Sequence, residues 1–232
     1  MRIDIMTLFP ELCDNILSCS IIGRARNASI LDIRIHNIRD FSEDKHRRVD
    51  DSPYGGGKGM LMAAPPIYNC YKHITEDCLE KPYTVYMSPQ GKVLTQKKSE
   101  SLSRLDHLVI LCGHYEGIDE RIIEQIVDEE ISIGDYVLTG GEIPACILVD
   151  SVGRLVKGVL SDSECHEVES ISGGILEYPQ YTRPYEFNGS KVPDVLLSGN
   201  HSDIEKWRRE EAMKRTLRKR PDLIKGSNDD AD

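Results

Sequence analysis

The chain opens with Arg2-Ile-Asp-Ile-Met-Thr-Leu8, and the alternation of these residues is typical of a β-strand. Pro10 follows at a position that suits the first turn of a helix, which we expect to run towards Ala28. Residues 30–38 then return to a period of two. This opening predicts the order strand, helix, strand.

The same alternation of elements continues as far as residue 156. Three further strands are predicted at Tyr83–Ser88, His107–Gly113 and Glu130–Ile133. Helices are predicted between and after them, at Gln96–Leu105, Ile118–Val127 and Glu142–Val156. Strands that alternate with helices predict an α/β fold in which a mostly parallel sheet carries helices on its faces.

The chain changes character after Leu160, which predicts its domain organisation. Residues 1–160 are expected to form one α/β domain. Residues 161–175 are acidic, small and aperiodic, and are expected to form a flexible linker or lid. Residues 176–224 are expected to form a small helical domain with a helix from about Asp203 to Arg220, and the polar tail 225–232 is expected to be disordered.

Composition restricts the class of protein. Of the 232 residues, 39% are hydrophobic, and no segment approaches the roughly 18 apolar residues that span a membrane, so we expect a cytoplasmic protein with no membrane partner. Seven cysteines without a C-x-x-C pair favour reduced thiols over a disulfide framework or a zinc knuckle. A net charge of −10 excludes indiscriminate coating of nucleic acid, so an RNA partner would need a local basic patch.

A glycine cluster, Tyr54-Gly-Gly-Gly-Lys-Gly-Met60, invites comparison with a phosphate-binding loop. A nucleotide-hydrolysing loop is disfavoured because Lys58 is followed by Gly59 rather than by Ser or Thr. Two interpretations remain. The cluster is either a flexible turn between elements or a loop whose backbone lies close to a ligand.

Three more glycine-bearing segments lie at or just after the carboxyl ends of predicted strands, at residues 86–92, 111–117 and 132–142. Each alone could be an ordinary tight turn. In an open α/β sheet, however, loops at this edge converge on a ligand-binding crevice. Their backbone groups, tyrosine rings and the Glu116 carboxylate would suit a ligand that combines a purine, a ribose and a positive charge, although Glu116 could also be a solvated loop acid.

The predicted carboxy-terminal helix has eight basic and four acidic residues between Asp203 and Arg220. Four of the basic residues share one face, namely Arg208, Arg215, Arg218 and Lys219. A solvated helix with Glu210–Lys214 and Glu211–Arg215 pairs explains part of this pattern but not the surplus of positive charge. We therefore favour contact with RNA phosphates. Trp207 is expected to anchor the core of this unit rather than to stack on a base.

Several long blocks, in one consistent order, resemble the signature sequences of a known family. They are Tyr54-Gly-Gly-Gly57, Gly59-Met-Leu-Met62, Ser88-Pro-Gln-Gly91, Tyr115-Glu-Gly-Ile-Asp-Glu-Arg121, Ser132-Ile-Gly-Asp-Tyr-Val-Leu-Thr-Gly-Gly141, Tyr181-Thr-Arg-Pro184 and Leu196-Leu-Ser-Gly-Asn-His201. The chain resembles the bacterial tRNA (guanine-N1)-methyltransferases, the TrmD family of the SPOUT superfamily, from residue 1 to about residue 224.

The resemblance implies a SPOUT-type sheet with a trefoil knot at the end of the catalytic domain, which periodicity alone could not reveal. It also implies a homodimer with shared active sites and a tRNA substrate. The implied cofactor is S-adenosylmethionine. Its contacts would come from Tyr86, Ser88, Pro89, Gly113, Glu116, Gly117, Ile133, Gly134, Tyr136, Leu138, Gly140, Gly141 and Pro144.

The reaction implied by the resemblance is methylation of N1 of guanosine 37, on the 3′ side of the anticodon. Because N1 of guanine carries a proton near neutral pH, a general base must remove it, and an arginine suits the negative charge that develops on O6. Arg154 matches the family's arginine, and Glu169 occupies the position of its catalytic aspartate. Magnesium is also implied, with ligands that the sequence does not identify.

Two further departures from the family lie near the expected site. Lys58 stands where the family usually has proline, and His114 replaces an arginine. The alternative to an enzyme is a noncatalytic RNA-binding protein on the same scaffold. Loss of Glu116, Arg154 and a carboxylate at position 169 would favour that alternative, but all three are present.

Overall fold

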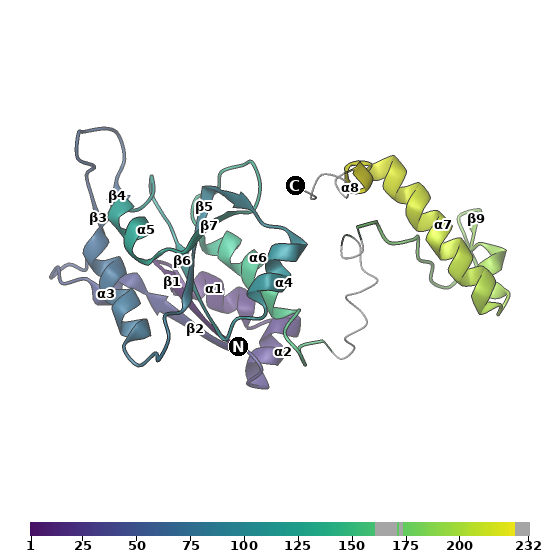
Figure 1. Cartoon of the computed structure of the whole chain (residues 1–232), viewed down its shortest axis with the longest axis horizontal. Helices are drawn as coiled ribbons and strands as arrows, with labels where there is room; N and C mark the ends of the chain where they lie inside the picture. The colour runs from purple at the N-terminus through teal and green to yellow at the C-terminus, as the bar shows by residue number, and fades with distance from the viewer. Residues whose placement is uncertain (161–170, 172–173, 226–232) are drawn as a thin grey trace. The chain divides into compact units, whose positions relative to one another are not determined.

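The computed structural model describes residues 1–160, 171 and 174–225. The chain divides into two compact units, Met1–Ser161 and Asp162–Asp232 (Figure 1). The expected linker and tail fall largely outside the described residues.

The first unit is built on a five-stranded sheet with the order β2-β1-β6-β5-β7. Its strands are β1 (Arg2–Thr7), β2 (Asp32–Asn37), β5 (Tyr83–Val93), β6 (His107–Cys112) and β7 (Glu129–Ser132). Every neighbouring pair is parallel, which confirms the expected α/β fold with a mostly parallel sheet. A separate antiparallel pair, β3 (Asp50–Asp51) and β4 (Leu61–Met62), forms the root of a hairpin.

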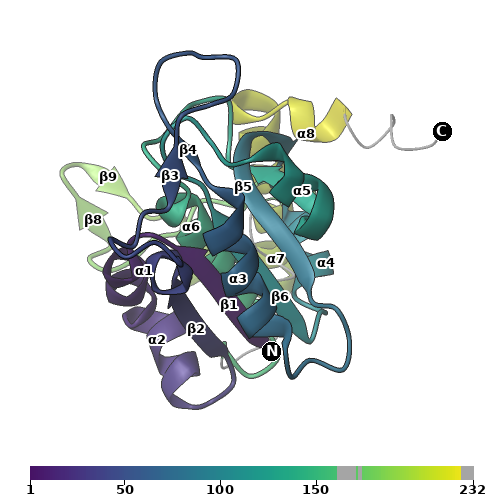
Figure 2. The same cartoon turned by 90° about the vertical axis from the view of Figure 1, so that its left-hand side faces the viewer.

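Helices cover both faces of the sheet (Figure 2). One face carries α1 (Pro10–Leu17), α2 (Ser20–Asn27), α4 (Gln96–Leu102) and α6 (Glu142–Gly153), and the other carries the 3-10 helix η1 (Ile38–Phe41), α3 (Ala64–Thr75) and α5 (Glu120–Ile126). Along β6, Leu108 and Ile110 pack into the first core, whereas Val109 and Leu111 pack into the second. This alternation between two buried faces is what a covered parallel sheet requires.

The single helix expected from Pro10 towards Ala28 is wrong, because the structure contains two helices, α1 and α2. The chain turns at Ser18 and Cys19, and Ser20 has a positive φ of 55°. At Gly23, a Cβ atom would overlap the carbonyl group of Ser18. The turn therefore needs a glycine at this position, a requirement that helical periodicity does not reveal.

One helix, α3, was not predicted from the sequence. It begins with Ala64, Pro65 and Pro66, and a proline in the first turn is compatible with a helix because the amide groups there have no partner within the helix. Its buried face, formed by Ile67, Tyr71 and other residues, covers the second core. The proline pair thus marks a helix start rather than a loop.

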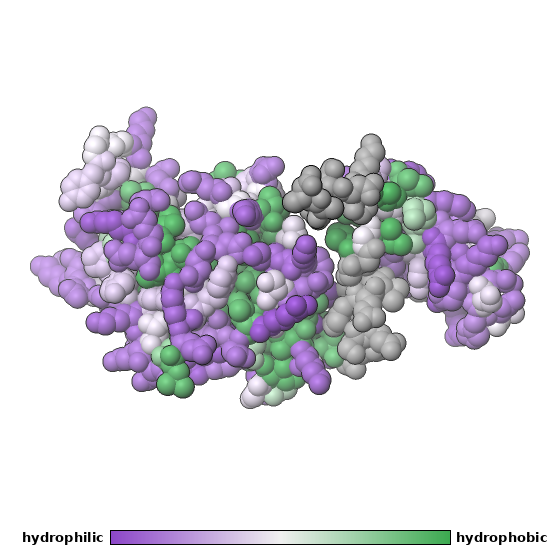
Figure 3. Space-filling view, viewed as in Figure 1, coloured by the Kyte–Doolittle hydropathy of each residue, from purple (hydrophilic) through white to green (hydrophobic). Residues whose placement is uncertain are grey.

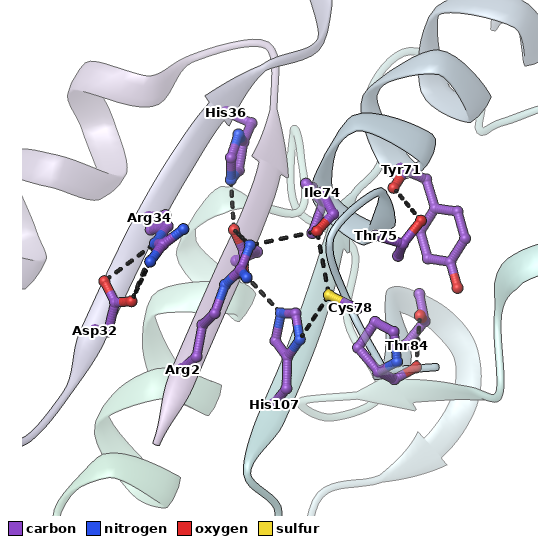
Figure 4. A network of polar contacts seen from close by, with 12 residues as sticks. Arg2, Asp32, Arg34, His36, Tyr71, Ile74, Thr75, Cys78, Thr84 and His107 are labelled. Atoms are coloured by element: carbon purple, nitrogen blue, oxygen red, sulfur yellow. Dashed lines mark hydrogen bonds and ion pairs between the residues drawn. The ribbon is translucent and has the colours of Figure 1, made fainter. Parts of the chain in front are cut away.

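A polar network lies within the sheet at Asp4, whose side chain is fully buried (Figure 4). Its Oδ1 atom lies 2.6 Å from Nε2 of His36, and Oδ2 lies 2.7 Å from Nε2 of His107. Arg2 donates to the same carboxylate at 2.6 Å. Three partners from β1, β2 and β6 thus compensate the cost of burying this charge.

The second unit is organised by the long helix α7 (His201–Lys219). Its other elements are β8 (Glu186–Phe187), β9 (Ser190–Lys191), the 3-10 helix η3 (Asp194–Leu197) and α8 (Asp222–Lys225). Thr216, buried on α7, accepts a hydrogen bond of 2.8 Å from the amide of Leu176. The predicted helix from Asp203 to Arg220 is confirmed to within two residues at its start and one at its end, and the unit also contains a β-hairpin.

Trp207 was expected to anchor the core of the second unit, and the structure agrees with this only in part. Its side chain is half-buried, and its ring centre lies 6.4 Å from that of Tyr181. Among the described residues of both units, no helix is long and apolar enough to cross a membrane.

Candidate active site

A pocket of about 530 Å³ lies at the carboxyl ends of β5, β6 and β7. The three glycine-bearing segments, at residues 86–92, 111–117 and 132–142, all contribute to its walls, as the rule for open α/β sheets predicts. The pocket brings together twelve of the thirteen residues expected to bind the cofactor: Tyr86, Ser88, Pro89, Gly113, Glu116, Gly117, Ile133, Tyr136, Leu138, Gly140, Gly141 and Pro144.

The thirteenth, Gly134, does not line the pocket but shapes the loop that does. Its φ of 142° is a conformation that side chains rarely adopt. Its carbonyl oxygen accepts hydrogen bonds from the hydroxyl of Ser132 at 3.0 Å and from the amide of Tyr136 at 2.9 Å. Gly134 therefore folds the turn that presents Tyr136 to the pocket.

Two glycines are required by close approach in the pocket wall. A Cβ atom on Gly141 would lie 2.8 Å from Cα of Cys112, where the loop before α6 meets the end of β6. The amide of Gly141 also donates to the carbonyl of Gly113 at 2.9 Å. A Cβ atom on Gly113 would lie 2.7 Å from the hydroxyl oxygen of Tyr86. The loop before α6 and the end of β6 can approach this closely only because Gly113 and Gly141 have no side chains.

Strand β5 becomes irregular where it reaches the pocket. Its register with β7 shifts between Met87 and Lys92, so the strand does not end at Ser88 as predicted but continues beyond an irregular stretch. The amide of Gln90 donates to the hydroxyl of Ser88 at 3.1 Å within that stretch. A Cβ atom on Gly91 would overlap the backbone of β7. The irregularity turns Ser88, Pro89 and Gln90 towards the pocket.

The pocket walls are acidic. Glu116 is joined there by Glu120 and Glu130, which the sequence analysis did not identify as site residues. The signal for Glu130 was its place at the start of β7, two residues before an identified segment. Burial, and then the nearby charges of Glu130 and Glu120, raise the pKa of Tyr86 to about 12, so its phenol stays protonated at neutral pH. Three carboxylates would favour a cationic ligand.

The glycine cluster of residues 54–60 lies in the hairpin between β3 and β4. At its root, Gly59 has a φ of 90°, and a Cβ atom there would overlap the side chain of Glu116. The amide of Glu116 donates to the carbonyl of Met60 at 3.1 Å, and Leu61 of β4 lines the pocket. Part of the cluster thus packs closely against the pocket wall, while the approach of its backbone to a ligand, which one of the two interpretations predicted, stays a prediction.

A buried polar group underlies the pocket at the start of α6. Glu142 is only 3% exposed, and its Oε1 atom accepts a hydrogen bond of 2.8 Å from the hydroxyl of Thr7. His114, which lines the pocket, packs against Phe9 with ring centres 5.0 Å apart. Its Nδ1 atom is buried and lacks a hydrogen-bond partner within the described part of the chain. A Cβ atom on Gly140 would lie 2.8 Å from that nitrogen.

The two residues expected to act on the substrate are placed differently by the structure. Arg154 directly follows α6 and is half-buried. Glu169 lies outside the described residues. Arg154 does not line the pocket. The geometry of the first unit therefore brings together twelve of the residues expected to bind the cofactor but does not bring Arg154 into the wall of their pocket.

In the second unit, Arg215 and Arg218 line a recess of about 370 Å³ together with Lys214 and Tyr181. The other two residues of the expected basic face lie elsewhere. Arg208 packs over the ring of Tyr178 at 4.9 Å and is ion-paired with Glu205 at 2.6 Å, while Lys219 is exposed.

The ion pairs expected along this helix take a different form. The side chain of Glu211 pairs with Lys214 at 2.7 Å, three residues away, rather than with Arg215. This leaves Arg215 directed to the recess, where it lies with Arg218. Part of the surplus positive charge is therefore gathered on one concave surface. In the space-filling view, the visible surface along α7 is largely hydrophilic (Figure 3).

Comparison with known proteins agrees with this geometry. The family described as tRNA (Guanine-1)-methyltransferase TrmD matches residues 1–226. A tRNA (guanine-N(1)-)-methyltransferase of Ruminiclostridium cellulolyticum is 58% identical over 224 residues, covering 97% of this chain and 96% of the relative. Proteins of the same name from Clostridioides difficile and Halalkalibacterium halodurans are 54% and 50% identical, covering 99% and 97% of this chain and 100% and 92% of the relatives.

The match covers both structural units and the linker between them. It therefore includes the pocket at the sheet edge and the basic recess. On these grounds the chain belongs to the TrmD family of tRNA (guanine-N1)-methyltransferases.

Proposed function

We propose that this protein transfers a methyl group from S-adenosylmethionine to N1 of guanosine 37 in tRNA. The pocket at the carboxyl ends of β5, β6 and β7, with its acidic walls and glycine-lined backbone, is the observation that carries the proposal. A tRNA substrate also implies that the protein acts in the cytoplasm.

The residues of the pocket fit the proposed cofactor. Its volume of about 530 Å³ lies within the usual range for sites that hold small molecules. Gly113, Gly140 and Gly141 leave backbone accessible where side chains would fill the space, and Glu116 supplies negative charge for a cation. When bound, the cofactor supplies an electrophilic methyl group on a positively charged sulfur.

The remaining chemistry is assigned to the side chains of this chain. We assign the general base to Glu169, whose carboxylate would take the N1 proton, and the stabilisation of negative charge on O6 to Arg154. Glutamate carries the same carboxylate as the family's aspartate on a longer arm, so the linker must place it differently. A displacement of about 1 Å can cost roughly a hundredfold in rate, which makes the linker's position decisive.

The metal ion that the resemblance implies finds no support in the described residues. None of them form a group of three or more His, Cys, Asp or Glu side chains suited to a metal. The proposed steps therefore use no metal ion.

We assign recognition of tRNA to the second unit. The recess is lined by Lys214, Arg215 and Arg218 together with Glu211, which pairs with Lys214, so it carries an excess of positive charge on a protein whose net charge is −10. Such a patch attracts backbone phosphates and positions an RNA without reading its bases. The target guanosine would then be splayed out of the anticodon loop, because its N1 edge must reach the methyl group.

We also propose that the protein is a homodimer that pairs through α1 and α6. These two helices pack against each other and leave apolar side chains exposed. Phe9, Leu12 and Ile16 at α1 are 40%, 42% and 45% exposed, and Ile143 and Ile147 on α6 are 47% and 42% exposed. Apolar side chains gathered on two adjacent helices favour a protein contact over solvent.

The trefoil knot and the division into catalytic and tRNA-binding domains complete the proposal. The loop before α6 returns to the end of β6, where Gly141 meets Cys112 and Gly113. We propose that the chain is knotted at this place. We further propose domain boundaries at residues 160 and 176, with residues 161–175 as a lid.

Methylation of unmodified tRNA tests the proposal. Purified protein with labelled cofactor should methylate tRNA that has guanosine at position 37, and tRNA with adenosine there should remain unlabelled. Glu169→Gln and Arg154→Ala should lose nearly all activity while still binding the cofactor in calorimetry. Full activity in Glu169→Gln would remove the assignment of the base. The alternative, a noncatalytic RNA-binding protein, predicts tRNA binding by the wild type without product.

A further inference from the structure

The tip of the β3–β4 hairpin carries an aromatic side chain that touches nothing. Tyr54 is 100% exposed. It is followed by Gly55 and Gly56, where an added Cβ atom would meet no other atom within 4 Å. The hairpin projects from the body of the first unit in both cartoon views (Figures 1 and 2). A single exposed aromatic residue is ordinary, and what distinguishes Tyr54 is the contact between the root of its hairpin and the pocket wall.

The root of the hairpin is held firmly against the pocket. Strands β3 and β4 pair with each other, and the amide of Ala63 donates to the carbonyl of Val49 at 2.8 Å. Gly59 packs directly on the side chain of Glu116, and the amide of Glu116 donates to Met60. Since Glu116 and Leu61 both line the pocket, the hairpin rises from the pocket wall itself.

Arg121, in the first turn of α5, is exposed, and it directly follows Glu120, another residue of the pocket wall. Lys58, on the hairpin, is exposed. A ring, a cation and a set of glycines are thus carried by a hairpin whose root forms part of the pocket wall.

We propose that the ring of Tyr54 stacks on a nucleobase of the anticodon loop next to the target guanosine, with Lys58 against a neighbouring phosphate. This inference rests on the proposed tRNA substrate. Splaying one base out of a loop exposes the faces of its neighbours, and an aromatic ring can cover such a face whatever the base. The glycines at positions 55–57 all have a positive φ, and their backbone freedom lets the ring adopt the orientation that stacks on the exposed base.

A protein partner fits this tip less well than RNA does. Interfaces between proteins bury an extended surface, whereas the tip offers one ring followed by three glycines and a lysine. The apolar residues that suit a second copy of this chain gather on α1 and α6 instead. One ring with an adjacent cation is, by contrast, the combination that single-stranded nucleic acid recognises.

Binding measurements with the full chain test the inference. Tyr54→Ala should weaken tRNA binding about tenfold, the size expected for the loss of one base–ring stack, while Tyr54→Phe should bind as the wild type does. Leu79→Ala is the matched control, because Leu79 is equally exposed on the same unit and should have no effect. Lys58→Ala should lower the slope of binding affinity against salt concentration by about one. Affinity for S-adenosylmethionine should be unchanged in all four.

A fluorescent base distinguishes stacking from general loss of affinity. With 2-aminopurine next to the target guanosine, binding of the wild type should quench its fluorescence further than binding of Tyr54→Ala at saturation. Equal tRNA affinity and equal quenching in the two proteins would overturn the inference. So would a change of oligomeric state in Tyr54→Ala, which would point to a protein contact. If binding depends on Tyr54 but the wild type makes no methylated product, the proposed function fails and this inference stands.

Discussion

The hydroxyl of Thr7 donates a hydrogen bond of 2.8 Å to Oε1 of Glu142, and both side chains are buried. The two residues are 135 positions apart in the chain. Their contact ties the end of β1 to the first turn of α6, directly after Gly141 in the pocket wall. A carboxylate in the first turn of a helix is also favoured by the helix dipole.

Replacement of Thr7 should therefore destabilise the fold. Thr7→Val keeps the shape of the side chain but leaves the buried carboxylate of Glu142 without its donor, at a cost of about 1–3 kcal/mol in the free energy of unfolding. Thr7→Ser retains the hydroxyl, so its free energy of unfolding should fall less than that of Thr7→Val. Urea denaturation of the three proteins measures the difference, and equal stability of Thr7→Val and the wild type would contradict the assigned role.

Stability should fall in acid because of Asp4. Burial raises its pKa, but hydrogen bonds from His36, Arg2 and His107 outweigh this and lower it from 3.8 to about 2. A lowered pKa means that the stabilisation is complete above about pH 4 and is lost as the pH falls through about 2, with a size of about 2 kcal/mol. Asp4→Asn should be less stable at pH 6 and show a shallower loss between pH 5 and pH 3. The surface variant Asp14→Asn should follow the wild type.

Substitution of Gly141 should disable the pocket. The Cβ atom of Gly141→Ala would approach Cα of Cys112 and the amide nitrogen of Gly113, and these backbone atoms cannot rotate away. We expect cofactor affinity to fall at least about tenfold, since the wall must shift and ligand sites tolerate little displacement. Gly56→Ala is the control, because it has a positive φ but open space around it. Calorimetry measures the cofactor affinity of both variants, and thermal melts confirm that they are folded. A folded Gly141→Ala variant with the cofactor affinity of the wild type would contradict the prediction.

Removal of the basic recess should weaken tRNA binding without affecting the cofactor. The double variant Arg215→Ala/Arg218→Ala removes two potential phosphate contacts, so the slope of log affinity against log salt concentration should decrease by about two. Lys191→Ala, on β9 of the same unit, removes a cation outside the recess and serves as the control. Filter binding at several salt concentrations gives the slopes, and parallel lines for the double variant and wild type would exclude the recess from RNA contact.

The apolar surface of α1 and α6 should control oligomeric state. Ile147→Asp places a charge among Phe9, Leu12 and the other exposed apolar residues, where a second copy would have to desolvate it. We expect the variant to sediment as a monomer and the wild type as a dimer. Asp150→Ala, at an exposed position on the same helix, should leave the dimer intact. A wild type that sediments as a monomer would remove the proposed interface.

The strands and most helices followed from the sequence because alternation and helical periodicity are local properties. The residues of β1 and β6 alternate between two cores, and this alternation can be recognised in the amino-acid sequence. The break between α1 and α2 was missed because it depends on Gly23 meeting Ser18 across a turn. The ion pairs of α7 were misplaced because rotamers decide between neighbours three and four residues away.

The residues expected to bind the cofactor could be named from motifs, but the full wall of the pocket could not. The sequence by itself determined an α/β chain with a basic helix near its end and glycine-bearing segments expected to converge at one edge of the sheet. Only the tertiary structure decided that Glu120 and Glu130 join Glu116 in the pocket wall and that the root of the hairpin of Tyr54 forms part of it. The physical reason is that periodicity reports which face of an element is buried, whereas the strand order and the contacts between distant segments depend on packing across the whole sheet.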